Sequence, residues 1–76
     1  MIKEHEQVVL TADMPEEGLK AGDVGTVVHI HKGHKAVEVE FFTVGGDTLA
    51  VATAKTSEIR SIRKSDIVHA RQFATA

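Results

Sequence analysis

Residues 19–28 read Leu-Lys-Ala-Gly-Asp-Val-Gly-Thr-Val-Val, and this stretch decides the fold that the sequence predicts. Gly22 and Gly25 flank Asp23; glycine adopts positive φ without steric cost, and aspartate readily bonds to nearby backbone groups. Residues 26–31 are rich in β-branched side chains, which suit a pleated, half-buried surface. The stretch therefore predicts a tight turn that leads directly into a strand.

Two strands are predicted on either side of a short hairpin turn. Residues 24–31 and 36–43 form the strands, and Lys-Gly-His-Lys at residues 32–35 forms the turn. A register that is symmetric about the turn separates an inner apolar face from an outer face. The inner pairs are Ile30 with Val37, Val28 with Val39 and Thr26 with Phe41; the outer pairs are His29 with Glu38 and Val27 with Glu40.

A second turn, Val-Gly-Gly-Asp at residues 44–47, leads into a fourth strand. A three-residue loop at 45–47 pairs Phe41 with Val51 and keeps apolar side chains inside, whereas a two-residue loop would turn Leu49 and Val51 outward. Periodicity therefore favours the three-residue loop. It leaves an apolar strip on the outer surface that suits contact with a partner or a second copy, unless a chain terminus covers it. The strip contains Phe42, Ala50 and Ala52, with Val27 beside them.

The N-terminal part supplies a first strand and a long loop. Residues 7–12 alternate well enough for a strand, and Pro15 then breaks it because proline fixes its own φ. Residues 13–18 form a loop that leads into the glycine turn. The side chains expected to form the core are Val28, Ile30, Val37, Val39, Phe41, Leu49 and Val51.

Length and composition indicate one small domain. The chain has 76 residues, a formal net charge of −2 and no cysteine, so disulfides and thiolate metal sites are excluded. No apolar run approaches the roughly 20 residues of a membrane span, and the N-terminus lacks a signal-peptide segment. We therefore expect a soluble, cytoplasmic protein. Residues 1–47 carry nine acids and four bases (net −5), and residues 48–76 carry five bases and two acids (net +3).

Residues 15–28, Pro-Glu-Glu-Gly-Leu-Lys-Ala-Gly-Asp-Val-Gly-Thr-Val-Val, resemble a family of small bacterial SH3-like barrel domains of unknown function. The resemblance runs from about Val8 to Phe73, since residues 65–71 are also similar to that family. It implies an all-β fold: a small SH3-like barrel of five to six short antiparallel strands with a 3₁₀ turn before the last strand. The whole chain, residues 1–76, would be this single domain. The glycine turn and its strand also resemble, more loosely, the KOW-type strand of ribosomal and transcription-factor proteins.

The C-terminal third is expected to complete this barrel. Residues 59–62 predict a short strand, and residues 63–66 resemble the 3₁₀ turn that precedes the last strand of SH3-like barrels. Residues 67–73 would be that last strand. The alternative is a helix that begins at Ser65, whose side chain can cap it and whose following apolar spacing permits it. The strand is the favoured interpretation.

Three histidines lie on or beside the predicted hairpin. His29 and His31 share a strand face because they are two residues apart, His34 lies on the turn, and Glu38 adds a carboxylate. Together these groups could hold a metal ion. Exposed histidines on a hairpin are the simpler interpretation, so we predict neither a metal nor a cofactor.

An acidic loop is a candidate partner site. Asp13, Glu16 and Glu17 could receive a basic partner, although such a loop is usually only solvated. Recognition of proline-rich peptides by true SH3 domains needs a groove lined by aromatic residues, and the chain has no tryptophan or tyrosine. We therefore expect no specificity for proline-rich peptides.

A basic set near the C-terminus is a candidate nucleic-acid contact. It consists of Arg60, Arg63, Lys64 and Arg71, with only Phe73 nearby for base stacking. An acidic chain is also a poor general binder of phosphate backbones. Solubilising charge and pairing with the acidic half of the chain is the favoured explanation.

The residues point to a binding module rather than an enzyme. Ser57, Ser61 and Ser65 lie outside any nucleophile elbow, and no carboxylate pair is placed around a cleft. We predict an accessory module that binds another macromolecule, most plausibly a protein, and that self-associates. The resemblance implies an antitoxin-like partner of a neighbouring gene product. The alternative is a KOW-like nucleic-acid-binding protein.

Overall fold

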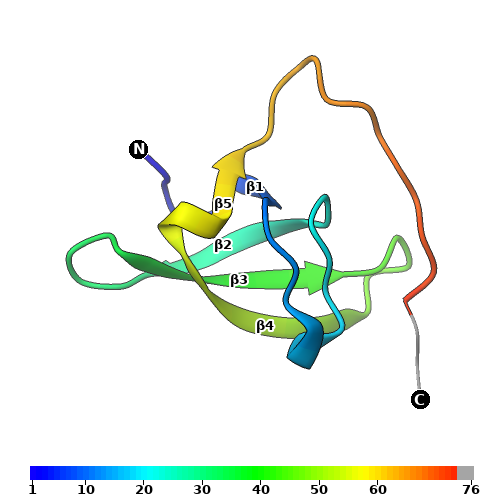
Figure 1. Ribbon diagram of the computed structural model, residues 1–76, viewed down its shortest axis with the longest axis horizontal. Coiled ribbons are helices and arrows are strands. Elements are labelled where there is room, and N and C mark those ends of the chain that lie inside the picture. The colour runs from blue at the N-terminus through cyan, green and yellow to red at the C-terminus, as the bar shows by residue number, and fades with distance from the viewer. Residues whose placement is uncertain (74–76) are drawn as a thin grey trace.

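The fold is one curled antiparallel sheet, described from a computed structural model of residues 1–73 (Figure 1). Within these residues the sheet has five strands in the order β4-β3-β2-β1-β5. Two 3₁₀ turns accompany them, and the second immediately precedes β5. The all-β fold class, with antiparallel strands and a 3₁₀ turn before the last strand, is confirmed. The elements are β1 (Gln7–Leu10), η1 (Pro15–Glu17), β2 (Val24–Ile30), β3 (Ala36–Phe42), β4 (Thr48–Lys55), η2 (Thr56–Glu58) and β5 (Ile59–Ser61).

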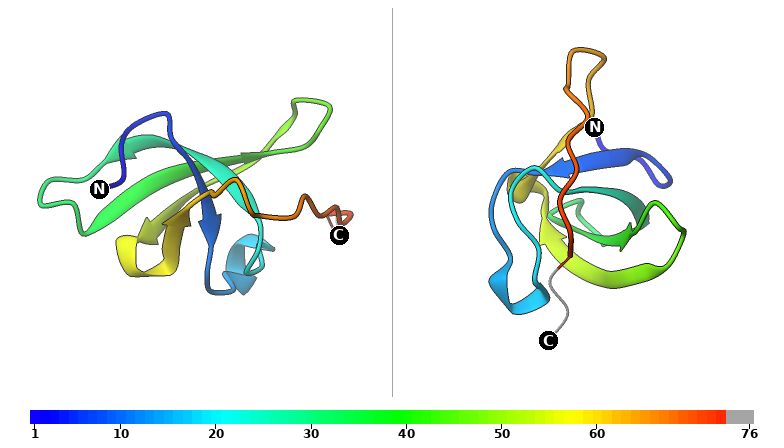
Figure 2. Two further views of the ribbon diagram at one scale, coloured as in Figure 1. Left: turned by 90° about the horizontal axis from the view of Figure 1, so that it is seen from above. Right: turned by 90° about the vertical axis from the view of Figure 1, so that its right-hand side faces the viewer.

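The last strand is earlier in the chain than the sequence predicts. The 3₁₀ turn is η2 and not residues 63–66, and the last strand is β5, which pairs with β1. Residues 62–73 contain neither the predicted strand nor the alternative helix. They leave β5 and return along the outside of the molecule, orange to red in Figure 2. β5 already occupies the free side of β1, so this tail has no place in the sheet there.

The strands curl around a small apolar core. The right-hand view of Figure 2 shows this curl from one end. Of the seven predicted core residues, Val37, Val39 and Phe41 are buried, and Ile30 and Leu49 are half-buried. Val28 and Val51 are 38% and 53% exposed, so their assignment was wrong. The buried core consists of Val8, Leu10, Leu19, Val27, Val37, Val39, Phe41, Ala52, Ala54 and Ile59.

A β-bulge explains the error at Val28. The predicted pairs of Ile30 with Val37 and His29 with Glu38 are confirmed, but the register shifts between Val27 and His29. A bulge places an extra residue in one strand and reverses which side chains face inward beyond it. Val27 therefore pairs with Val39 and is fully buried, while Val28 lies outside the core.

The register of β3 with β4 explains the error at Val51. Phe41 pairs with Ala50 and Val39 with Ala52, which is the register of the two-residue loop that periodicity disfavours. The register then shifts between Phe41 and Phe42. β4 consequently turns small alanine side chains toward the core, opposite the large side chains of β3, and turns Val51 outward.

Candidate functional site

The acidic loop between β1 and β2 is a small closed hairpin. Met14 and Leu19 exchange backbone hydrogen bonds of 2.9 and 3.1 Å, and Gly18 closes the turn with φ of 71°. Leu19 is buried in the core and holds the hairpin against the sheet. Glu16 and Glu17 lie at its exposed tip, and no ion pair to either is present within residues 1–73.

Asp13, the third acidic residue of this loop, has a structural role. One carboxylate oxygen of Asp13 accepts a hydrogen bond of 2.9 Å from the backbone N–H of Ala21. This bond connects the start of the loop to the glycine turn that follows it. Asp13 therefore positions the loop.

The C-terminal tail holds this loop in place through a contact that we call the tail anchor, formed by Arg71 and Phe73. The Arg71 guanidinium donates hydrogen bonds to both carboxylate oxygens of Asp23 and, at 3.1 Å, to the carbonyl of Gly18. The Phe73 ring packs so closely against Gly18 that a Cβ there would lie 3.2 Å from it. Burial raises the pKa of Asp23, but the hydrogen bonds from Arg71 and from the Lys20 backbone lower it by more. The pKa of Asp23 therefore lies below its ordinary value.

A groove lies between this loop and β4, with a cavity volume of about 470 Å³. Its lining combines apolar side chains with four carboxylates, and no basic side chain lines it in the part of the chain that the structure describes. Such a lining favours a ligand that carries cationic groups on an apolar or extended backbone. We call this surface the acidic groove. Its lining residues are Asp13, Met14, Pro15, Glu16, Glu17, Val51, Ala52, Thr53 and Glu58.

The sequence analysis found only one wall of the acidic groove. It singled out the loop residues Asp13, Glu16 and Glu17 but missed Val51, Thr53 and Glu58 on the opposite side. Glu58 is held by a 2.9 Å hydrogen bond from the backbone N–H of Lys55 to its carboxylate. A glutamate three residues after a strand end is a local signal for such a bond. No local signal places β4 beside the loop.

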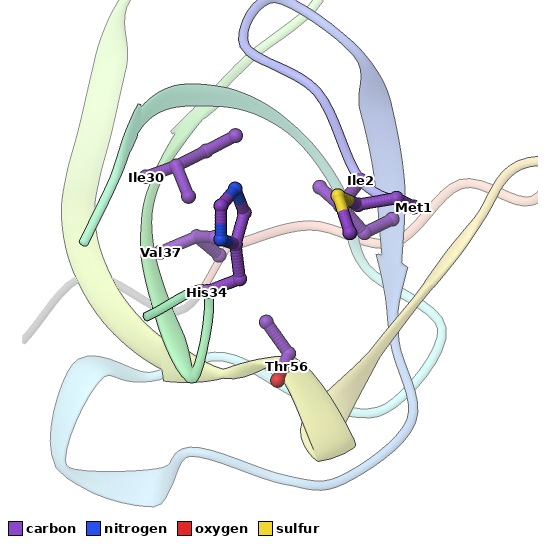
Figure 3. Close-up of a pocket in the computed structure, with 6 residues that line it drawn as sticks. All are labelled: Met1, Ile2, Ile30, His34, Val37 and Thr56. Carbon is purple, nitrogen blue, oxygen red and sulfur yellow. The ribbon is translucent and has the colours of Figure 1, made fainter. Parts of the chain in front are cut away.

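A second hollow lies beside the turn of the β2–β3 hairpin (Figure 3). Its cavity volume is about 290 Å³, and Ile30 and Val37 lie on one side with Met1 and Ile2 on the other. Among the described residues that line it, only His34 and Thr56 have polar side chains, and none has a carboxylate. It therefore offers fewer side-chain groups for binding than the acidic groove.

The structure keeps His29 and His31 together and places His34 elsewhere. His31 shares a short hydrogen bond with Glu38, and the His29 ring packs edge-on against His31 with centroids 5.2 Å apart. Hydrogen bonds from His31 and from the Thr53 hydroxyl lower the pKa of Glu38. His34 lines the hollow of Figure 3 instead. Within residues 1–73 no group of three or more His, Cys, Asp or Glu side chains is placed to hold a metal ion.

The predicted basic set does not form one patch. Arg60 binds both carboxylate oxygens of Asp66, at 2.8 and 2.9 Å, and Arg71 binds Asp23 beside the acidic loop. The Arg60 guanidinium lowers the pKa of Asp66 to about 2. Only Arg63 and Lys64 of the set remain exposed without a side-chain partner among the described residues.

The predicted apolar strip on the outer surface is corrected by the register of the sheet. Phe42 is 46% exposed and Ala50 is half-buried, but Val27 and Ala52 belong to the core. Both corrections follow from the bulge in β2 and from the β3–β4 register. The four residues therefore do not share one exposed face.

The sheet and its groove define a small all-β domain with an acidic surface cleft. Residues 4–61, which are more than half of the chain, match the family Domain of unknown function (DUF4926), and the chain belongs to that family. The expectation of a family of unknown function is thus confirmed. The match takes in all five strands and leaves the tail from residue 62 outside it. No curated protein and no solved structure matches the chain significantly. None of the helices in the described residues has the length and apolar character needed to cross a membrane.

Proposed function

We propose that this chain is a non-catalytic protein-binding module of SH3-like barrel form, and that its acidic groove binds a basic segment of a partner protein. The strand order and the 3₁₀ turn before β5 support the SH3-like form. The observation that carries the function is the groove itself, where Glu16, Glu17 and Glu58 line one cavity and no basic side chain of residues 1–73 joins them.

The resemblance of the sequence to accessory, antitoxin-like proteins supports a protein as the partner. Self-association through the predicted strip is not part of this proposal, because Val27 and Ala52 are buried. The nucleic-acid alternative is supported less well, since Arg60 and Arg71 already bind carboxylates of the same chain. Phosphate binding would have to break these pairs or rely on Arg63 and Lys64.

Cross-linked co-purification from nuclease-treated native lysate tests this function. The full chain is compared with a Glu16→Gln, Glu17→Gln double variant, which removes two charges from the groove and keeps the size of both side chains. The matched control is a Glu4→Gln, Asp47→Asn double variant, which removes the same charge away from the groove. We expect the groove variant, and not the control, to lose the partner.

Two results would contradict the proposal. Nuclease treatment could remove all bound material, which would point to nucleic acid as the ligand. Equal recovery of partner by the groove variant and the wild type would show that the carboxylates are not used.

A further inference from the structure

β4 is an edge strand with a free side. In Figure 1 it lies at the end of the sheet with β3 as its neighbour, and η1 (blue) lies close to it. The backbone N–H of Thr56 donates to the carbonyl of Lys35 at 3.0 Å. This bond shows which residues of β3 and β4 form the hydrogen-bonded pairs. In an antiparallel pair, hydrogen-bonded and non-hydrogen-bonded residues alternate. Val51 and Thr53 therefore direct their backbone N–H and C=O groups away from β3.

These edge groups have no backbone partner among the described residues. No turn or loop hydrogen bond within residues 1–73 involves the backbone of Val51 or Thr53. Natural edge strands are usually short or carry charges, proline or bulges that prevent a further strand from adding. β4 is eight residues long, contains no proline and has its one charged side chain, Lys55, at its end.

The free edge of β4 lies in the acidic groove. Val51, Ala52 and Thr53 are the β4 residues that line it, opposite the loop that carries Glu16 and Glu17. A segment in this groove would therefore meet unpaired backbone groups on one side and carboxylates on the other.

We propose that the partner segment binds as an extended strand added antiparallel or parallel to β4, with lysine or arginine side chains directed at Glu16, Glu17 and Glu58. This inference rests on the proposed function and specifies how the groove is used. Strand addition takes its affinity from main-chain hydrogen bonds and its specificity from alternate side chains. The segment should therefore carry basic residues at every second position, with β-branched residues between them.

Charge decides between a partner and a second copy as the occupant. Pairing β4 with β4 of another copy would bring two acidic loops and two Glu58 carboxylates into the same region. Like charges in close contact oppose such pairing. A basic segment instead neutralises the groove, so we assign the edge to a partner protein.

The test is a nuclear magnetic resonance titration of the full chain with a synthetic peptide of alternating lysine and valine. We expect the amide signals of Val51 and Thr53 to shift, and their exchange with solvent to slow. A matched peptide, N-methylated on the residues whose N–H groups face β4, cannot donate these hydrogen bonds. It should bind about tenfold more weakly or worse.

The outcomes separate this inference from the proposed function. If the N-methylated peptide binds equally well, and the Glu16→Gln, Glu17→Gln variant still weakens both peptides, groove binding is supported and strand addition is wrong. If neither peptide binds at about 1 mM while the partner still co-purifies through the groove carboxylates, strand addition alone is again wrong. Concentration-dependent protection of Val51 and Thr53 without peptide would assign the edge to a second copy and overturn the inference.

Discussion

At the residue scale, Gly25 is the glycine with least room for a side chain. A Cβ there would lie 2.5 Å from Val39 Cγ1, 2.8 Å from the carbonyl oxygen of Glu40 and 2.9 Å from the Phe41 ring. The carbonyl belongs to the β3 backbone and cannot move without disturbing the ladder. We expect Gly25→Ala to destabilise the fold by about 1–3 kcal/mol, the usual cost of overpacking. Urea unfolding followed by circular dichroism measures this, because the chain has no tryptophan for fluorescence.

Gly45→Ala is the matched control for this substitution. Its nearest neighbour would be the Thr43 hydroxyl at 3.7 Å, which is ordinary contact, and no positive φ is involved. The control should therefore change stability little or raise it slightly, because alanine restricts the unfolded chain. An unfolding midpoint for Gly25→Ala equal to that of the control would show that β2 and β3 are not as close as described.

Residue-level prediction from the sequence succeeds up to the bulge and fails beyond it. The pairing of His29 with Glu38 follows from the hairpin turn and is confirmed. Val27 and Val28 are chemically identical, so the sequence contains nothing that says which of them faces inward. The choice is made by the bulge between Val27 and His29, which belongs to the pairing of β2 with β3.

At the element scale, the tail anchor should order the acidic loop. Arg71→Gln keeps a long polar side chain but removes the charge and the paired hydrogen bonds to Asp23. We expect the amides of Gly18 and Leu19 to exchange several-fold faster with solvent, while the urea midpoint of the sheet barely changes. Hydrogen exchange measured residue by residue separates these two effects.

The same contact predicts a pH dependence. The pKa of Asp23 in the folded chain lies below 3.8, its ordinary value, so the anchor contributes fully above pH 3.8 and is lost as the pH falls through the lowered value. The wild-type loop should therefore loosen below pH 3.8, and the Arg71→Gln loop should show no such change in that range. Unchanged exchange at Gly18 in the variant at neutral pH would show that Phe73 alone holds the tail.

The sequence predicts the strands well as elements and their connections less well. The bounds of β1, β2, β3 and β5 lie within two residues of the predicted stretches, and β4 follows the predicted turn at residues 44–47. The β3–β4 register was missed because inward alanines such as Ala52 and Ala54 are weak apolar signals beside outward Val51. The sequence predicts a strand in the tail because apolar residues such as Ile67 and Val68 are usually buried. In the structure both are more than 90% exposed.

At the scale of the whole molecule, the core is small enough that one large cavity should remove a large share of its stability. At roughly 0.05–0.15 kcal/mol per residue, a chain of this length is stable by about 4–11 kcal/mol. Leu10 lies in the strand that joins β2 to β5 and is 2% exposed. We expect Leu10→Ala to cost about 2–5 kcal/mol.

Val44→Ala is the control for this prediction, since Val44 is fully exposed at the β3–β4 turn. It should leave the free energy of unfolding within about 0.5 kcal/mol of wild type. A Leu10→Ala chain as stable as this control would contradict the placement of β1 between β2 and β5.

The sequence predicts the part of the candidate site that is contiguous in the chain, and it does not predict the part that the fold brings to it. The acidic tip at Glu16 and Glu17 is contiguous in the chain and was found. The opposite wall comes from β4 and η2, more than 30 residues away, and only the curl of the sheet brings Val51 and Glu58 to the loop. The spacing of residues in the sequence does not predict this curl, which accompanies the bulge in β2.

The exposed middle of the tail has a consequence for regulation. Ile67 and Val68 stand free in an irregular segment, between Asp66, held by Arg60, and Arg71, held by Asp23. Extended, accessible backbone of this kind is what proteases cleave first. One cut there would detach Arg71 and Phe73 while all five strands stayed joined in one piece, so proteolysis would release the acidic loop from the tail without unfolding the domain.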